Sequence, residues 1–256
     1  MMRYSSKRCK TMRTVFDERR SSITEILQEP ALPYHDGSHA RYRLEKAEEM
    51  LSNLQPHVSI DSEQELLLRV CALTLDCGRN GPLGFRHPES APEERVESNM
   101  KKLFGHCIPK GSTRSIVDHA VTYVTQWNDY VDGTVRPHVA TSKTKKLLCL
   151  ADAYCISKGW DVFLDALLRL SEECPRRPVT DIDDFIDDGE RFLDLFVRRQ
   201  IENMEDFFER EYYHVLRSNY RDIHAMLKRL RENGPERNSA RERLESITQD
   251  VNGVLV

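Results

Sequence analysis

The chain has 256 residues, of which 39% are apolar and 31% are charged, and its formal net charge is −4 at pH 7. This length predicts one large domain, or one domain with an appendage. The small negative charge does not favour a nucleic-acid partner, for which only a local basic patch could argue. No apolar run approaches the roughly 20 residues that a membrane span needs, so we expect no membrane segment.

The N-terminal residues and the cysteines both bear on the compartment. Residues 1–22 are predicted to be a mobile, polar and basic leader without the apolar stretch of a secretory signal. The seven cysteines contain no Cys-x-x-Cys pair, and several fall in apolar helical patterns. Such cysteines are typical of small core residues in a reducing compartment. We therefore expect a cytoplasmic protein.

The pattern of apolar residues predicts helices along the whole chain. A helix is expected over residues 36–54, with Asp36 as its N-cap and apolar residues three and four positions apart. Asp61 or Ser62 caps a second helix, which runs to Cys77. A segment rich in glycine and proline follows. Further helices are predicted over residues 93–104, 112–130, 142–157 and 160–170.

The C-terminal part of the chain differs in composition. Residues 23–174 are predicted to form a helical core, and residues 175–233 to form long charged helices that pack on it. Residues 234–256 are expected to be a polar tail. No alternating pattern of useful length indicates a β-strand, so the fold class is predicted to be all-α, a helical bundle with additional long C-terminal helices.

One short segment carries most of the chemistry. The segment from Pro33 to Ala40 reads Pro-Tyr-His-Asp-Gly-Ser-His-Ala, and it places His35 before a helix start and His39 in its first turn. Two aspartates lie in very apolar company further along, Asp76 and Asp152. A buried carboxylate is unfavourable unless it is paired or bound to a cation. These groups on three helical segments predict one polar site in an apolar interior.

This order of motifs resembles the HD phosphohydrolase superfamily over about residues 33–158. The first segment is similar to the Tyr-His-Asn-x-x-His-Ala of its cyclic-nucleotide phosphodiesterases, with Asp36 in the Asn position. The resemblance implies an HD-domain-like helical bundle that hydrolyses phosphate esters at a metal centre. It also implies that His35 protonates the leaving oxygen and that His39, Asp76 and Asp152 hold the metal.

The chain departs from that family at one ligand. Where the family has its adjacent His-Asp pair, this sequence has Leu75-Asp76. The remaining set of one imidazole and two carboxylates favours a divalent magnesium or manganese ion over iron or zinc. A metal would lower the pKa of a bound water and neutralise phosphoryl charge.

The chain also resembles the phosphodiesterase domain of SidE-type effectors, which work without metal. His35, Ser38, His39, Gly78 and Arg79 match that branch. Its catalytic glutamate is Pro82 here, and its later histidine falls near Cys149.

Three further residues are candidates for substrate binding. Arg79 opens the glycine-rich segment and provides a planar phosphate clamp. His87 and His119 are the other candidates, with a surface residue or a core-edge histidine as the alternative for each. The expected substrate is a small phosphorylated molecule or nucleotide, whose identity these residues do not specify.

Three functions remain open at this point. The first is an HD-like phosphoester hydrolase with an incomplete metal site. The second is a non-catalytic HD-like pseudoenzyme that senses a ligand or binds a protein, which the Leu75 replacement favours. The third is a metal-free, SidE-like histidine phosphodiesterase.

Overall fold

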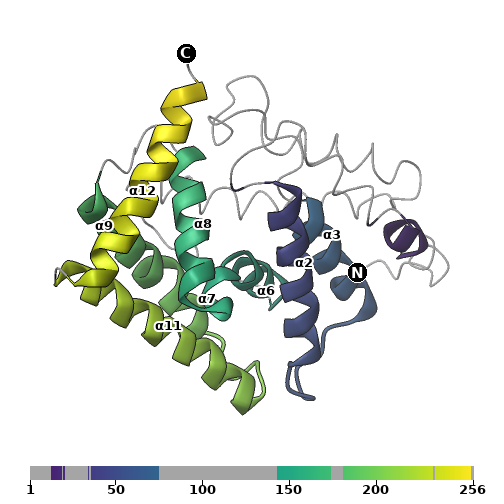
Figure 1. Cartoon of the computed structure of the whole chain (residues 1–256). Helices are drawn as coiled ribbons and strands as arrows, with labels where there is room; N and C mark the ends of the chain where they lie inside the picture. The colour runs from purple at the N-terminus through teal and green to yellow at the C-terminus, as the bar shows by residue number, and fades with distance from the viewer. Residues whose placement is uncertain are drawn as a thin grey trace. The chain divides into compact units, whose positions relative to one another are not determined.

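The structure is a computed structural model, and it describes residues 13–18, 20, 34, 36–74, 143–173, 181–232 and 234–254 (Figure 1). Within these residues the regular elements are helices, and no β-strand is present, which confirms the all-α prediction. None of the described helices combines the length and the apolar composition that crossing a membrane requires. The chain divides into two compact units, Met1–Asp152 and Ala153–Val256.

The first unit contains three described helices that pack against one another: α2 (Gly37–Ser52), α3 (Ser62–Thr74) and α6 (Lys143–Asp152) (Figure 1). Their inner faces are apolar and almost fully buried, with Leu44 on α2, Leu68 on α3 and Leu147 on α6 each at most 1% exposed. Part of the N-terminal segment is also ordered on this unit, because residues 13–18 are helical and Phe16 is buried.

Both predicted helix starts in this unit are confirmed. The Asp36 carboxylate accepts a hydrogen bond from the backbone N–H of His39 at 2.8 Å, as an N-cap does. The Asp61 carboxylate accepts from the N–H groups of Glu63 and Gln64 at 3.0 and 2.8 Å. The two caps fix where α2 and α3 begin, and therefore which of their residues face each other.

The second unit contains the remaining described elements (Figure 1). They are α7 (Cys155–Lys158), α8 (Trp160–Glu173), α9 (Ile182–Phe192), the π-helix η2 (Leu193–Arg198), α10 (Arg199–Glu202), α11 (Arg210–Arg231) and α12 (Pro235–Val254). The long helix α11 contacts α7, α8, α9 and α12, so it is the element on which the others assemble. The tail predicted to be polar is helical up to Val254.

Two expected helices are interrupted. The segment predicted as one helix over residues 142–157 is broken at Ala153 and Tyr154, between α6 and α7. The charged helical stretch up to residue 232 is divided by η2 and by a turn before α11. The helices expected over residues 93–104 and 112–130 lie outside the described residues.

Candidate functional site

The capped start of α2 places His39 in the interior. The Asp36 cap also accepts from the Ser38 hydroxyl at 2.6 Å, which fixes the first turn of the helix. The His39 side chain is 1% exposed, and its ring centroid lies 4.3 Å from that of Tyr34. The helix start thus directs an imidazole into the first unit.

Asp152 meets His39 from the last residue of α6. One carboxylate oxygen of Asp152, Oδ1, lies 3.1 Å from His39 Nε2, and the Asp152 side chain is 2% exposed. The two residues are 113 positions apart in the chain. The structure therefore brings together two of the three residues that the sequence analysis proposed as metal ligands.

A third residue, Arg43, belongs to this buried group. Its Nη1 donates to Asp152 Oδ1 at 2.7 Å and lies 3.2 Å from His39 Nε2. Its Nε donates to the backbone carbonyl of Ala72 at 2.6 Å. That carbonyl lies on α3. One fully buried guanidinium therefore joins α2, α3 and α6.

The sequence analysis missed Arg43, although a signal for it was present. Arg43 follows His39 by one helical turn and lies next to Leu44 in the apolar stripe of α2. An arginine at this place faces the same side of the helix as the histidine. A buried aspartate elsewhere in the chain requires a cationic partner, and this arginine provides it.

The imidazole can take only one role at Nε2 at a time. If Nε2 carries the proton, it donates to the Asp152 carboxylate, and if it is unprotonated, it accepts from Arg43. The Asp152 carboxylate and the Arg43 guanidinium form an ion pair at 2.7 Å. The group is a buried ion pair with an imidazole beside it.

The part of the chain that the structure describes contains two of the three proposed metal ligands, His39 and Asp152, whereas Asp76 lies outside it. Among the residues that the structure describes, no three His, Cys, Asp or Glu side chains lie close enough together to hold one ion. The oxygen of Asp152 that faces His39 is the same atom that binds the Arg43 guanidinium. A positive group of the protein itself thus contacts two of the three side chains that the resemblance implies as metal ligands.

His35, Asp76, Arg79, His87 and His119 lie outside the described residues. Their roles stay predictions from the sequence.

The reactivity of the Cys71 thiol on α3 tests whether the interior of the first unit is closed to solvent. Burial raises the pKa of its thiol from 9.0 to about 12, against a smaller lowering effect of the Arg43 charge. The raised pKa means that the folded state favours the neutral thiol. The resulting contribution of Cys71 to the free energy of unfolding is complete below about pH 9, and it is lost as the pH rises from about 9 to about 12.

We expect Cys71 to resist iodoacetamide at pH 8 in the folded protein and to react once urea unfolds it, because the reactive species is the thiolate. Peptide mass spectrometry of the alkylated protein measures both states. Rapid labelling of Cys71 in the folded protein would contradict the burial described above.

Comparison with known proteins finds no relative: no family model, no curated protein and no solved structure matches this chain.

Proposed function

We propose that this chain is an HD-like helical module in which an arginine takes the place of the metal, and that it acts by binding a partner protein rather than by metal-dependent hydrolysis. The observation that carries the proposal is the buried contact of the Arg43 guanidinium with Asp152 and His39. The long charged helices of the second unit supply the surface for such a role.

The charges of the buried group support this proposal. The Arg43 guanidinium already neutralises the Asp152 carboxylate at 2.7 Å. Two unit charges about 4 Å apart interact by about 4 kcal/mol at an effective dielectric constant of about 20, and by about twice that where one is divalent. A divalent cation bound to the same carboxylate oxygen would be repelled by the guanidinium. Metal binding at this oxygen would therefore be opposed by Arg43 in its present position.

The burial of the same group supports it as well. The side chains of His39, Arg43 and Asp152 are between 0 and 2% exposed. A hydrolytic site needs contact between the reacting phosphorus, the attacking water and the catalytic groups. Among the described residues, these three side chains contact one another and the Ala72 carbonyl of α3, which is the arrangement of a structural clamp.

A metal-free histidine phosphodiesterase is the second candidate. It is favoured by the Asp36-capped start of α2, because His35 directly precedes a helix N-terminus, where backbone N–H groups bind phosphate. In this alternative His35 transfers the proton, and the buried Arg43 has a structural role without taking part in the reaction.

The experiment measures bound metals by elemental analysis and the hydrolysis of bis(p-nitrophenyl) phosphate, with manganese chloride or with EDTA. We expect no stoichiometric metal, no turnover, and no rise of Tm on addition of manganese, since an ion that binds the folded state raises stability. Wild type is compared with Asp76→Asn and His35→Ala, each checked by circular dichroism.

Two other results would overturn the proposal. Stoichiometric metal with manganese-dependent turnover that Asp76→Asn abolishes would establish the metal-dependent hydrolase. Turnover that persists in EDTA and disappears in His35→Ala would establish the metal-free phosphodiesterase.

A further inference from the structure

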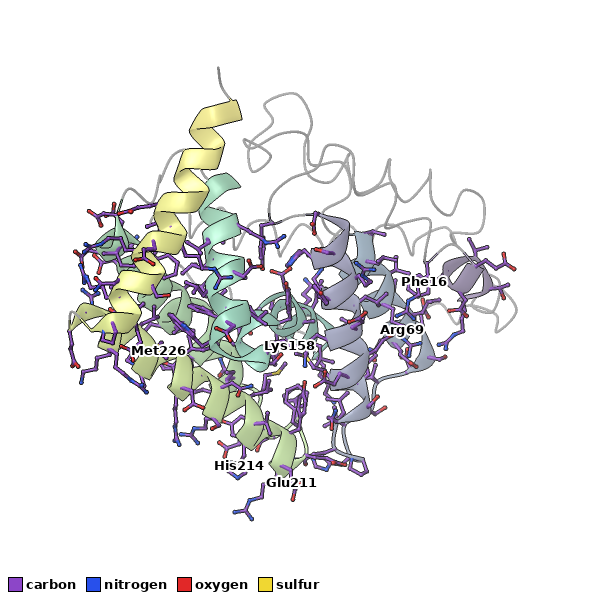
Figure 2. All side chains as sticks on the ribbon, in the orientation of Figure 1. Phe16, Arg69, Lys158, Glu211, His214 and Met226 are labelled. Atoms are coloured by element: carbon purple, nitrogen blue, oxygen red, sulfur yellow. The ribbon has the colours of Figure 1, made fainter. Side chains whose placement is uncertain are left out.

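One face of α11 carries a regular row of basic residues. Their positions in the sequence are alternately four and three residues apart over the whole helix. We call this row the basic stripe, and its members are Arg210, His214, Arg217, Arg221, His224, Lys228 and Arg231. All are exposed except His224, which is half-buried. Figure 2 labels His214 near the start of the helix.

The orientation of the basic stripe is fixed by the packed face of α11. Tyr213, Leu216, Ile223, Leu227 and Leu230 are buried, and each precedes a member of the basic stripe by one residue. One residue corresponds to a rotation of about 100° around a helix. The basic stripe therefore runs beside the packed face along the length of α11.

The last member of the basic stripe shows what these side chains recognise within the protein. Arg231 Nη2 binds Asp187 at 2.5 Å and Glu190 at 2.7 Å, and both carboxylates lie on α9. Asp187 and Glu190 are three residues apart and therefore lie on one face of α9. One guanidinium of the basic stripe thus already binds an acidic helix through neighbouring carboxylates.

The middle of the basic stripe has no such partner within the described part of the chain. Arg217, Arg221 and Lys228 form no ion pair there with a carboxylate within 4.0 Å. Ion pairs with single exposed residues contribute little, but a row of them in register with a complementary row gives specificity and speeds association.

We propose that the basic stripe docks an acidic α-helix of a partner protein, whose carboxylates recur at the same three- and four-residue spacing. This deepens the proposed function by naming its partner class. The rise of about 1.5 Å per residue is common to both helices, so basic and acidic groups at equal spacing stay in register along the whole contact.

The surroundings of the basic stripe favour a protein helix over a nucleic acid. Burial raises the pKa of Tyr213, Glu205 and Glu202 raise it further, and Arg217 and Arg221 lower it. Acidic side chains therefore lie around the same tyrosine as the middle of the basic stripe. They would repel a continuous row of phosphates, whereas a partner helix can present basic residues to them.

The test uses fluorescence anisotropy of a labelled synthetic helical peptide whose glutamates are alternately three and four residues apart. A peptide of the same composition with its glutamates spread around the helix and a short DNA duplex are the comparison ligands. The unmodified chain of 256 residues is compared with Arg217→Glu/Arg221→Glu. Arg221→Glu and Arg229→Glu form the matched pair, since Arg229 is exposed on α11 outside the basic stripe.

We expect the patterned peptide to bind more tightly than both comparison ligands, and the double variant to weaken it about tenfold. Arg221→Glu should weaken binding by about threefold and Arg229→Glu should leave it unchanged. Raising sodium chloride from roughly 0.05 to 0.5 M should also weaken it.

Equal binding of the two peptides, tighter binding of DNA, equal losses in Arg221→Glu and Arg229→Glu, or no peptide binding at low salt would each overturn the proposal. Circular dichroism shows that each variant is folded. Metal content and diester hydrolysis are independent of the basic stripe, so failure of this inference and failure of the proposed function give different results.

Discussion

Arg43→Met is expected to lower the free energy of unfolding by about 3–5 kcal/mol, because it leaves the Asp152 carboxylate buried without its guanidinium. Methionine preserves much of the aliphatic volume, so the loss is one of charge rather than of packing. The substitution also removes the donor to the Ala72 carbonyl. Urea unfolding followed by circular dichroism measures the change.

Arg41→Met is the matched control on the same helix. Arg41 is exposed, and a surface substitution of this kind is expected to change stability by less than about 0.5 kcal/mol. Equal effects of the two arginine substitutions would contradict a buried ion pair at Arg43.

A double-mutant cycle with Asp152→Asn separates the ion pair from other contributions. Asp152→Asn alone removes the carboxylate to which the buried Arg43 Nη1 donates, so we expect it to be costly as well. The double variant should be less destabilised than the sum of the two single variants, by a coupling of about 1–3 kcal/mol. A coupling near zero would mean that the two charges do not stabilise each other.

The first unit shows how much of a site can be predicted from sequence. The start of α2 at Asp36 was predictable because capping is local chemistry, and the spacing of apolar residues set the helix face. The approach of Asp152 to His39 was predictable because a carboxylate among leucines needs a polar partner.

Arg43 was not predicted, and the reason is physical. Arginine usually extends its charged end to water, so a single arginine in a stripe is ordinarily read as a surface residue. Burial of the Arg43 guanidinium is favourable because it contacts the Asp152 carboxylate on α6. These two residues are 109 positions apart in the chain.

The interruptions of the helices were missed for a related reason. Apolar periodicity reports which face of a segment is buried, and it continues through a short break. After Ala153 and Tyr154, the Ser157 hydroxyl and backbone N–H both bond to the Tyr154 carbonyl, at 2.7 and 3.0 Å. Asn219 of α11 donates to the Ser157 carbonyl at 2.9 Å. The break is thus stabilised by a residue distant in sequence.

Phe163→Ala is expected to lower the free energy of unfolding of the second unit by about 3–5 kcal/mol. Phe163 lies on α8 and is 1% exposed. Its ring centroid lies 6.1 Å from that of Trp160 and 6.2 Å from that of Phe192, so it joins α8 to α9. Removing the ring takes away its apolar contacts and leaves a cavity between the two helices.

Urea unfolding measures this effect, with Val215→Ala as the control. Val215 is 52% exposed on α11, so its truncation should cost less than about 0.5 kcal/mol. Phe163→Leu should fall between the two, because leucine refills part of the cavity. An equal cost for Phe163→Ala and Val215→Ala would mean that the aromatic contact between α8 and α9 does not stabilise the unit, and that α11 rather than this ring holds the two helices in place.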